Sequence, residues 1–168
     1  MNEHVSSGGY GVIGPEHVAE LSGLEIFARM HDGRLPAPPI AKLLDMTMSD
    51  YEHGRVAFVS TPHGELYNPL GTVHGGYTAA LLDSCMGCAV HSTLKAGQAY
   101  TTVELTVNYV RALTEATGEV RAEGKIISLG RQIATAEGRL TDASGKLLAH
   151  GTTTCIIFSA RSAQGASQ

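Results

Sequence analysis

The sequence predicts an α+β domain in which an antiparallel sheet wraps around one long helix, with an extra helix near the N-terminus. Residues 75–94 are apolar around most of the helical circumference, which is typical of a buried helix. After residue 98, short segments alternate polar and apolar positions or are rich in β-branched residues, which favours strands. The length of 168 residues suits a single domain with one core.

The first half of the chain is expected to hold one helix and two strands. Residues 1–15 are rich in Gly and Ser, and we expect a flexible segment before a domain that spans residues 16–159. Apolar positions recur at roughly helical spacing over 18–30, and Gly33 with the prolines after it ends this helix. Residues 43–49 and 55–60 are predicted to form strands.

The second half is expected to hold the central helix and four antiparallel strands. Gly97 provides a stop signal after the helix. The strands are predicted from alternation, β-branched residues and turn signals, at residues 102–109, 119–129, 132–141 and 147–158. Residues 160–168 are small and polar, and we expect them to form a flexible tail.

Composition argues against several classes of protein. The net charge of −4 gives no support to nucleic-acid binding, so no nucleic-acid partner is expected. No stretch approaches the roughly 20 apolar residues needed to cross a bilayer, and the N-terminus lacks the pattern of a signal peptide. Charged residues make up only 17%, which hints at surface buried in an oligomer. Cytoplasmic localisation is expected.

The cysteines and histidines do not form a metal or redox motif. Cys85 and Cys88 have redox spacing, but they lie inside a predicted helix, and with Cys155 they are expected to be free thiols. The eight histidines include no pair at metal-ligand spacing on one helix, so no metal is expected. A Gly-x-Ser-x-Gly nucleophile motif and a Walker-type phosphate loop are both missing from the sequence.

The most informative segment is the loop and helix start at residues 68–83. The loop begins at Asn68, and His74 with Gly75 and Gly76 opens the central helix. A helix start carries unpaired backbone N–H groups and a partial positive charge, so it can polarise a carbonyl or hold an anion. Asp83 then lies among apolar residues in mid-helix, where an acid needs compensation or a chemical role.

The spacing of these residues has a geometric consequence. Asp83 follows Gly75 by eight residues, which places the two about 12 Å apart along one helix. They cannot both touch one reacting atom within one subunit. If both are catalytic, the site must be shared between two subunits.

The joint spacing of Asn68, His74-Gly75-Gly76 and Asp83 resembles that of the hotdog-fold acyl-CoA thioesterases of the phenylacetate-degradation (PaaI-like) type. The resemblance covers roughly residues 23–158 and includes the segment at 32–40. It implies a hotdog fold, hydrolysis of an acyl- or aryl-CoA to the free acid and CoA, and no cofactor besides the coenzyme A of the substrate. It also implies a homodimer with shared sites, and a dimer of dimers (a homotetramer).

The catalytic roles follow from the chemistry of thioester hydrolysis and from this resemblance. Gly75 N–H is expected to polarise the carbonyl. Asn68 donates a second hydrogen bond or holds the water or the sulfur, and His74 orients Asn68 or donates toward the sulfur. Asp83 is either the general base or a nucleophile that forms a mixed anhydride. The family also uses a hydroxyl from the following strand to place the water, and Thr101 stands at the matching position.

Substrate binding is expected from residues around this motif and from two arginines. Arg111 and Arg131 follow predicted strand ends, where the family carries basic residues that suit the phosphates of coenzyme A. The full set of expected substrate-binding residues is Gly76, Tyr77, Leu82, Met86, Thr102, Asn108, Arg111, Gly130 and Arg131.

Two other functions remain open. The same fold can bind an acyl-CoA without hydrolysing it, and it can also serve a hydratase or dehydratase acting on enoyl or hydroxyacyl thioesters. The acyl group, aromatic or fatty, is not predicted.

Overall fold

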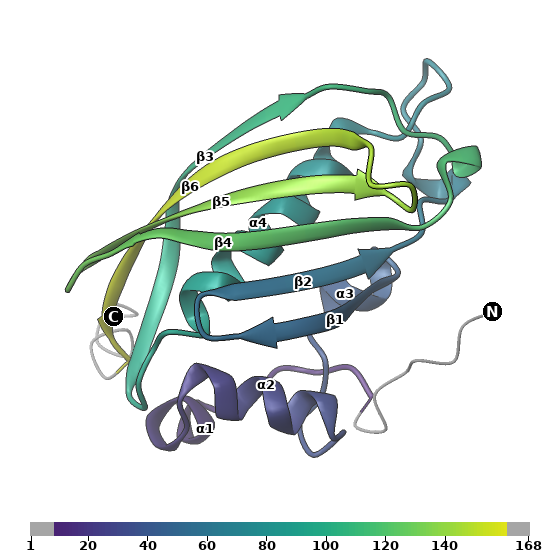
Figure 1. The fold of residues 1–168 in the computed structure, drawn as a ribbon. Coiled ribbons are helices and arrows are strands. Elements are labelled where there is room, and N and C mark those ends of the chain that lie inside the picture. Colours follow the sequence, from purple (N-terminus) through teal and green to yellow (C-terminus); the bar gives the residue numbers. More distant parts are fainter. Residues whose placement is uncertain (1–8, 161–168) are drawn as a thin grey trace.

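The computed structural model describes residues 9–160, which form one curved antiparallel sheet around a central helix (Figure 1). Of the segments expected to be flexible, 1–15 and 160–168, residues 1–8 and 161–168 lie outside the described residues. The sheet has the strand order β1-β2-β4-β5-β6-β3, with the bounds Met46–Glu52, Arg55–Ser60, Val120–Leu129, Ile133–Asp142, Leu147–Ser159 and Gln98–Tyr109. This is the hotdog arrangement that the sequence predicts.

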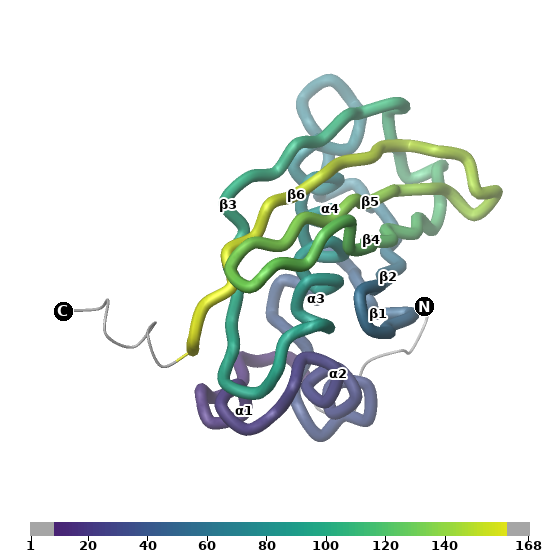
Figure 2. Tube along the Cα trace, turned by 60° about the vertical axis from the view of Figure 1, so that its left-hand side comes forward, coloured from purple at the N-terminus to yellow at the C-terminus, as the bar shows by residue number. Residues whose placement is uncertain are grey.

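The central helix α4 (Gly75–His91) lies in the curve of the sheet, as the turned view shows (Figure 2). Its apolar residues form the core, and glycines in the strands let the helix approach closely. A Cβ at Gly138 would lie 2.8 Å from Met86 Cγ, and one at Gly124 would lie 2.3 Å from the Cys85 carbonyl oxygen. The sheet can therefore curl tightly around α4.

The N-terminal region contains three short helices where the sequence predicts one. Helix α1 (Pro15–Glu20) and helix α2 (Gly23–His31) are separate because Ser22 and Glu25 form a capping box that starts a new helix. Helix α3 (Pro39–Leu43) takes up Leu43, so the first strand begins three residues later than predicted. Residues 9–11 are also held, because Gly11 N donates to the Ala37 carbonyl (2.9 Å).

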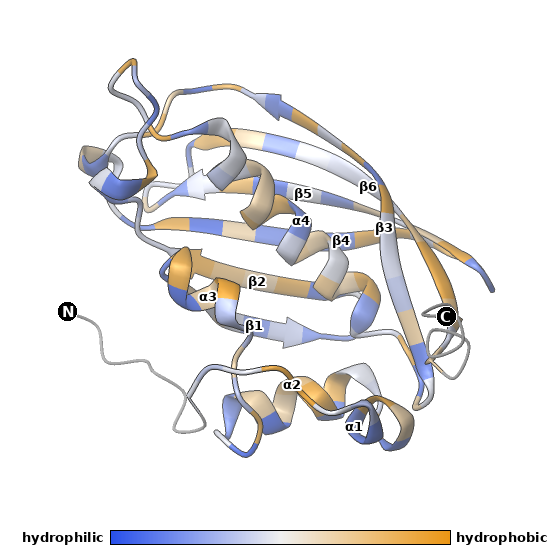
Figure 3. Ribbon diagram, turned by 180° about the vertical axis from the view of Figure 1, so that it is seen from behind, coloured by the Kyte–Doolittle hydropathy of each residue, from blue (hydrophilic) through white to orange (hydrophobic). Residues whose placement is uncertain are grey.

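One side of α4 is not covered by the sheet. Seen from behind, the helix lies in front of the strands (Figure 3). On this side a strip of α4 side chains and backbone stays at least partly exposed, and we call it the α4 strip: Gly76, Ala79, Ala80, Asp83, Ser84 and Cys88. These residues are small apart from Asp83, so another chain could approach closely.

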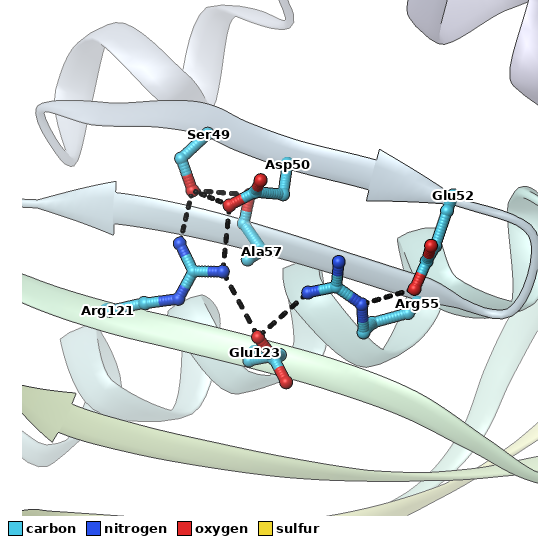
Figure 4. A network of polar contacts seen from close by, with 7 residues as sticks. All are labelled: Ser49, Asp50, Glu52, Arg55, Ala57, Arg121 and Glu123. Carbon is cyan, nitrogen blue, oxygen red and sulfur yellow. Dashed lines mark hydrogen bonds and ion pairs between the residues drawn. The ribbon is translucent and has the colours of Figure 1, made fainter. Parts of the chain in front are cut away.

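The outer face of β1, β2 and β4 carries a network of charges (Figure 4). Arg121 binds Asp50 (2.8 Å) and Glu123 (3.1 Å), and Glu123 also binds Arg55 (3.1 Å). The hydrogen bond from Arg121 holds the pKa of Asp50 below its usual range. Because these groups neutralise one another at the surface, we assign the network no chemical role.

Strand β3 forms one edge of the sheet and pairs only with β6 among the described residues. It is twelve residues long and begins earlier than predicted. Its exposed apolar side chains include Val103 (52% exposed) and Tyr109 (57%). A long apolar edge is a site for pairing with another strand. No helix within residues 9–160 is long and apolar enough to cross a membrane.

Candidate active site

The N-terminus of α4 offers a free hydrogen-bond donor. His74 is the N-cap residue, and its Nδ1 accepts a hydrogen bond from Gly76 N (2.9 Å). Nδ1 therefore carries no proton, and neutral His74 presents an N–H at Nε2. Gly75 is the first helical residue, and its N–H has no acceptor within residues 9–160. Two N–H donors thus sit at this helix end.

Tyr109 at the end of β3 holds the same helix start. Its hydroxyl donates to the Gly75 carbonyl oxygen (3.0 Å), and its ring would lie 3.3 Å from a Cβ at position 75. No pattern in the sequence points to Tyr109, although it stands next to the expected substrate-binding residue Asn108. Tyr109 therefore holds the Gly75–Gly76 peptide, which directly follows the peptide that bears the free donor.

Two cavities flank the helix start. One, of about 340 Å³, is lined by His74, Gly76 and Tyr77 together with Leu66 and Tyr67 of the preceding loop. The other, of about 250 Å³, lies on the β3 side. Among its lining residues are Gly75, Thr78, Tyr109 and Arg111. The helix start is therefore open to a ligand from two directions.

The side chain of Asn68 mainly holds its own loop. Its Oδ1 accepts from Leu70 N (2.9 Å) and Thr72 N (3.3 Å), and its Nδ2 donates to Thr72 Oγ1 (2.8 Å). This is the behaviour of an Asn that closes a turn. One of its two N–H donors stays available for a substrate.

Asp83 is half-buried on the α4 strip and is held by a threonine. Thr102 Oγ1 on β3 donates to Asp83 Oδ1 at 3.0 Å. Cys155 lies behind this pair, with its Sγ 3.9 Å from Thr102 Oγ1. The carboxylate is thus oriented by one hydrogen bond and retains its second oxygen for other partners.

The structure corrects the position of the hydroxyl that accompanies Asp83. Thr101 was expected there, but it is exposed and pairs with Ile156 on the outer face of the sheet. Thr102, the next residue, points inward because successive side chains of a strand alternate between faces. The expected substrate-binding residue Thr102 therefore takes the place expected for Thr101.

Three of the other expected substrate-binding residues on α4 are buried. Leu82 and Met86 are fully buried against Gly138, so the structure does not bring them to the surface near Asp83. Tyr77 is also buried, although it lines the larger cavity and shares a hydrogen bond with Ser60 Oγ (2.6 Å).

The two arginines expected to bind coenzyme A lie at opposite ends of the sheet. Arg111 lies where β6 begins, because its N–H donates to the Leu148 carbonyl (3.0 Å). Gly130 and Arg131 form the exposed turn before Ile133, which pairs with Ile156 near the end of β6. One protomer therefore does not bring them together. Asn108 is exposed on β3, opposite His150.

Two incomplete groups result: a helix start with free donors, and an oriented acid about 12 Å further along the same helix. The first can polarise a carbonyl and the second can take a proton from water. Together, but not separately, they contain the parts that hydrolysis of an activated acyl group requires. The fold and these groups define a hydrolase of the hotdog class.

Comparison with known proteins identifies the family. The sequence profile of the thioesterase superfamily matches residues 70–149, which contain the helix start and Asp83. The chain is 32% identical over 112 residues to "Putative esterase SSO2140" of Saccharolobus solfataricus, covering 66% of this chain and 77% of that protein. The chain belongs to the thioesterase superfamily, and its class of activity is thioester hydrolysis.

Solved structures agree with this assignment. A "phenylacetic acid degradation-related protein" of Ralstonia eutropha JMP134 has a TM-score of 0.71 and 29% identity, covering 77% of this chain and 98% of that one. Thioesterase HI1161 of Haemophilus influenzae has a TM-score of 0.67 and 21% identity, covering 72% and 83%. The second likeness supports the fold alone.

Proposed function

We propose that this protein hydrolyses an acyl- or aryl-CoA to the free acid and CoA, without a further cofactor, at sites shared between two copies of the chain. Gly75 N–H of one copy polarises the thioester carbonyl, with His74 and Asn68 as nearby donors. Asp83 of the other copy takes a proton from the attacking water, and Thr102 orients it. The observation that carries this proposal is the oriented, half-exposed Asp83 that lies about 12 Å from the helix start of its own chain.

The exposed edge of β3 supports association of two copies. An antiparallel pair of β3 strands would join two sheets into one and cover the apolar side chains of that edge. It would also bring the two α4 strips together, and their small residues suit close approach. The dimer is therefore part of the proposed mechanism.

The faces of β3 suggest a register for this pairing. Side chains opposite each other on paired strands point to the same face. If Thr106 pairs with the partner's Thr106, Leu105 would face the partner's Val107. Across the bulge after Thr102, Tyr109 would face the partner's Thr102. Gly75, held by Tyr109, would then lie beside the partner's Asp83, as the reaction requires.

The same pairing gives both arginines a role. It would place Arg111, at the helix-start end of one copy, near the Thr102 end of the partner, which also carries Arg131. Both guanidinium groups could then bind the phosphates of one coenzyme A. We further propose that two such dimers form a tetramer, and that the enzyme works in the cytoplasm. The free thiols of Cys85, Cys88 and Cys155 suit a reducing compartment.

The test is the release of free thiol from a panel of CoA thioesters. Asp83→Asn and Asp83→Ala should lower kcat by about 10²–10⁴-fold while thermal unfolding stays close to wild type. Glu137→Gln, at an exposed carboxylate on the outer face of β5, is the matched control and should retain activity. A near-wild-type rate in either Asp83 variant would contradict the proposed role.

The wild-type protein separates the remaining functions. Tight CoA binding without thiol release would favour a binding protein. Loss of crotonyl-CoA absorbance without thiol release would favour a hydratase.

A further inference from the structure

Tyr100 lies on the inner face of β3 and contacts α4 about one helical turn after Asp83. Its hydroxyl reaches α4 at Gly87, where a Cβ would lie only 2.6 Å from Tyr100 Oη. Gly87 follows Asp83 by four residues, and Tyr100 precedes Thr102 by two. The helix and strand run in opposite directions here, so Asp83 with Thr102 and Gly87 with Tyr100 form two successive contacts between α4 and β3.

The Tyr100 hydroxyl has no hydrogen-bond partner within the part of the chain that the structure describes. Burial, then the neighbouring thiols of Cys88 and Cys155 and the carboxylate of Asp83, hold the pKa of Tyr100 well above its usual range. The hydroxyl therefore stays protonated and uncharged. Gly87, against which the hydroxyl packs, follows Asp83 by about one turn of α4 and directly precedes Cys88 of the α4 strip.

A row of aromatic side chains continues from Tyr100. The ring of His91 packs against Tyr100 with the ring centres 5.8 Å apart, and Phe27 of α2 packs against His91 at 5.3 Å. Tyr51 of β1 continues the row at 6.1 Å from Phe27. Burial lowers the pKa of His91, so this wall carries no charge at neutral pH. Tyr100, His91, Phe27 and Tyr51 therefore form a continuous row of rings that begins at Gly87 of α4 and reaches α2 and β1.

We propose that Tyr100 is the specificity-determining residue of this enzyme and forms the floor of its acyl pocket. The proposal rests on the proposed thioesterase function and adds its substrate class. From Asp83 to Gly87 the helix rises about 6 Å, so the pocket accepts a short chain or a single ring and excludes long fatty acyl groups. Tyr100 acts through size, and Gly87 is required because it lets the ring lie across the helix.

The test is a chain-length profile of kcat/KM from acetyl-CoA to palmitoyl-CoA, with phenylacetyl-CoA as the single-ring substrate. Wild type should prefer the short and single-ring substrates. Tyr100→Ala should raise the ratio of long-chain to short-chain kcat/KM by about tenfold or more, because each added methylene gains a place to pack. Tyr100→Phe keeps the ring and should keep the wild-type profile.

Two further variants complete the design. Tyr10→Ala removes an exposed tyrosine and should leave the profile unchanged. Tyr100→Leu should give an intermediate profile, and it replaces the alanine variant if that protein does not fold. A wild-type preference for palmitoyl-CoA, or an unchanged profile in a folded and active Tyr100→Ala or Tyr100→Leu protein, would overturn the proposal. If wild type releases thiol from no substrate, the proposed function fails instead.

Discussion

The hydroxyl of Thr102 on β3 donates a 3.0 Å hydrogen bond to Asp83 on α4, and this contact joins the edge strand to the only acid of the central helix. It compensates the carboxylate for its partial burial and fixes its direction. Asp83 belongs to the α4 strip, and Thr102 faces it from the inner side of β3. The contact therefore presents an oriented acid to whatever docks on the α4 strip.

Removing this hydroxyl should impair catalysis more than substrate binding. Thr102→Val keeps the shape of the side chain but leaves Asp83 free to rotate, so we expect kcat to fall by about tenfold with little change in KM. Steady-state kinetics of thiol release measure both. Thr101→Val is the matched control, because Thr101 points to the outer face, and it should behave like wild type. A larger loss in the Thr101 variant than in the Thr102 variant would reverse the assignment.

The backbone donor at the helix start can be removed by a proline. Proline is well tolerated at the first position of a helix, and it lacks the N–H that we assign to the carbonyl. Gly75→Pro should therefore lower kcat by about 10²–10³-fold. Gly75→Ala adds a Cβ against the Tyr109 ring but retains the N–H, so it controls for bulk. Equal losses in the two variants would show that space, and not the donor, matters at position 75.

Tyr77 makes a testable contribution to stability. Ser60 donates its single hydroxyl proton to the Leu44 carbonyl (2.6 Å), so Tyr77 must be the donor in its 2.6 Å contact with Ser60. Tyr77→Phe leaves the buried Ser60 oxygen short of one hydrogen bond. We expect the free energy of unfolding at pH 7 to fall by about 1 kcal/mol, measured by urea denaturation. No change relative to a Tyr10→Phe control would contradict this role.

The buried Tyr77 hydroxyl should also make the free energy of unfolding depend on pH in the alkaline range. Burial raises the pKa of Tyr77 to about 12 from its ordinary value of 10.0. The stability that this shift contributes is fully present below pH 10 and is lost as the pH rises toward 12, because the unfolded chain ionises first. The unfolding free energy of Tyr77→Phe should therefore fall less steeply than that of wild type over this range. Parallel curves would contradict it.

The sequence predicts the fold more completely than the site. Alternation and flanking turn residues predict strands at 55–60 and 147–158, and both ranges agree with the structure within one residue. The break between α1 and α2 was missed, although Ser22 and Glu25 have the spacing of a capping box. Local sequence patterns are sufficient to predict a helix or strand wherever the burial of its apolar face alone determines that element.

Several expected site residues lie elsewhere than the sequence pattern indicates, and the reasons are physical. Thr101 and Thr102 are chemically identical neighbours, and only the register with β6 decides which one faces α4. Leu82 and Met86 belong to a helix that is apolar nearly all round, so the sequence does not reveal which side meets the sheet. Tyr100 can pack against α4 only because Gly87, thirteen positions earlier, has no side chain. No local sequence pattern links the two residues.

Paired inactive variants test the shared site most directly. Asp83→Asn and Gly75→Pro chains, carrying different affinity tags, would be co-expressed and the mixed dimers isolated by tandem purification. Each mixed dimer then contains one doubly impaired site and one intact site, so we predict up to about half of the wild-type kcat, although each variant alone is nearly inactive. Mixed dimers that are as inactive as the parent variants would contradict the claim that one copy supplies the helix start and the other supplies the acid.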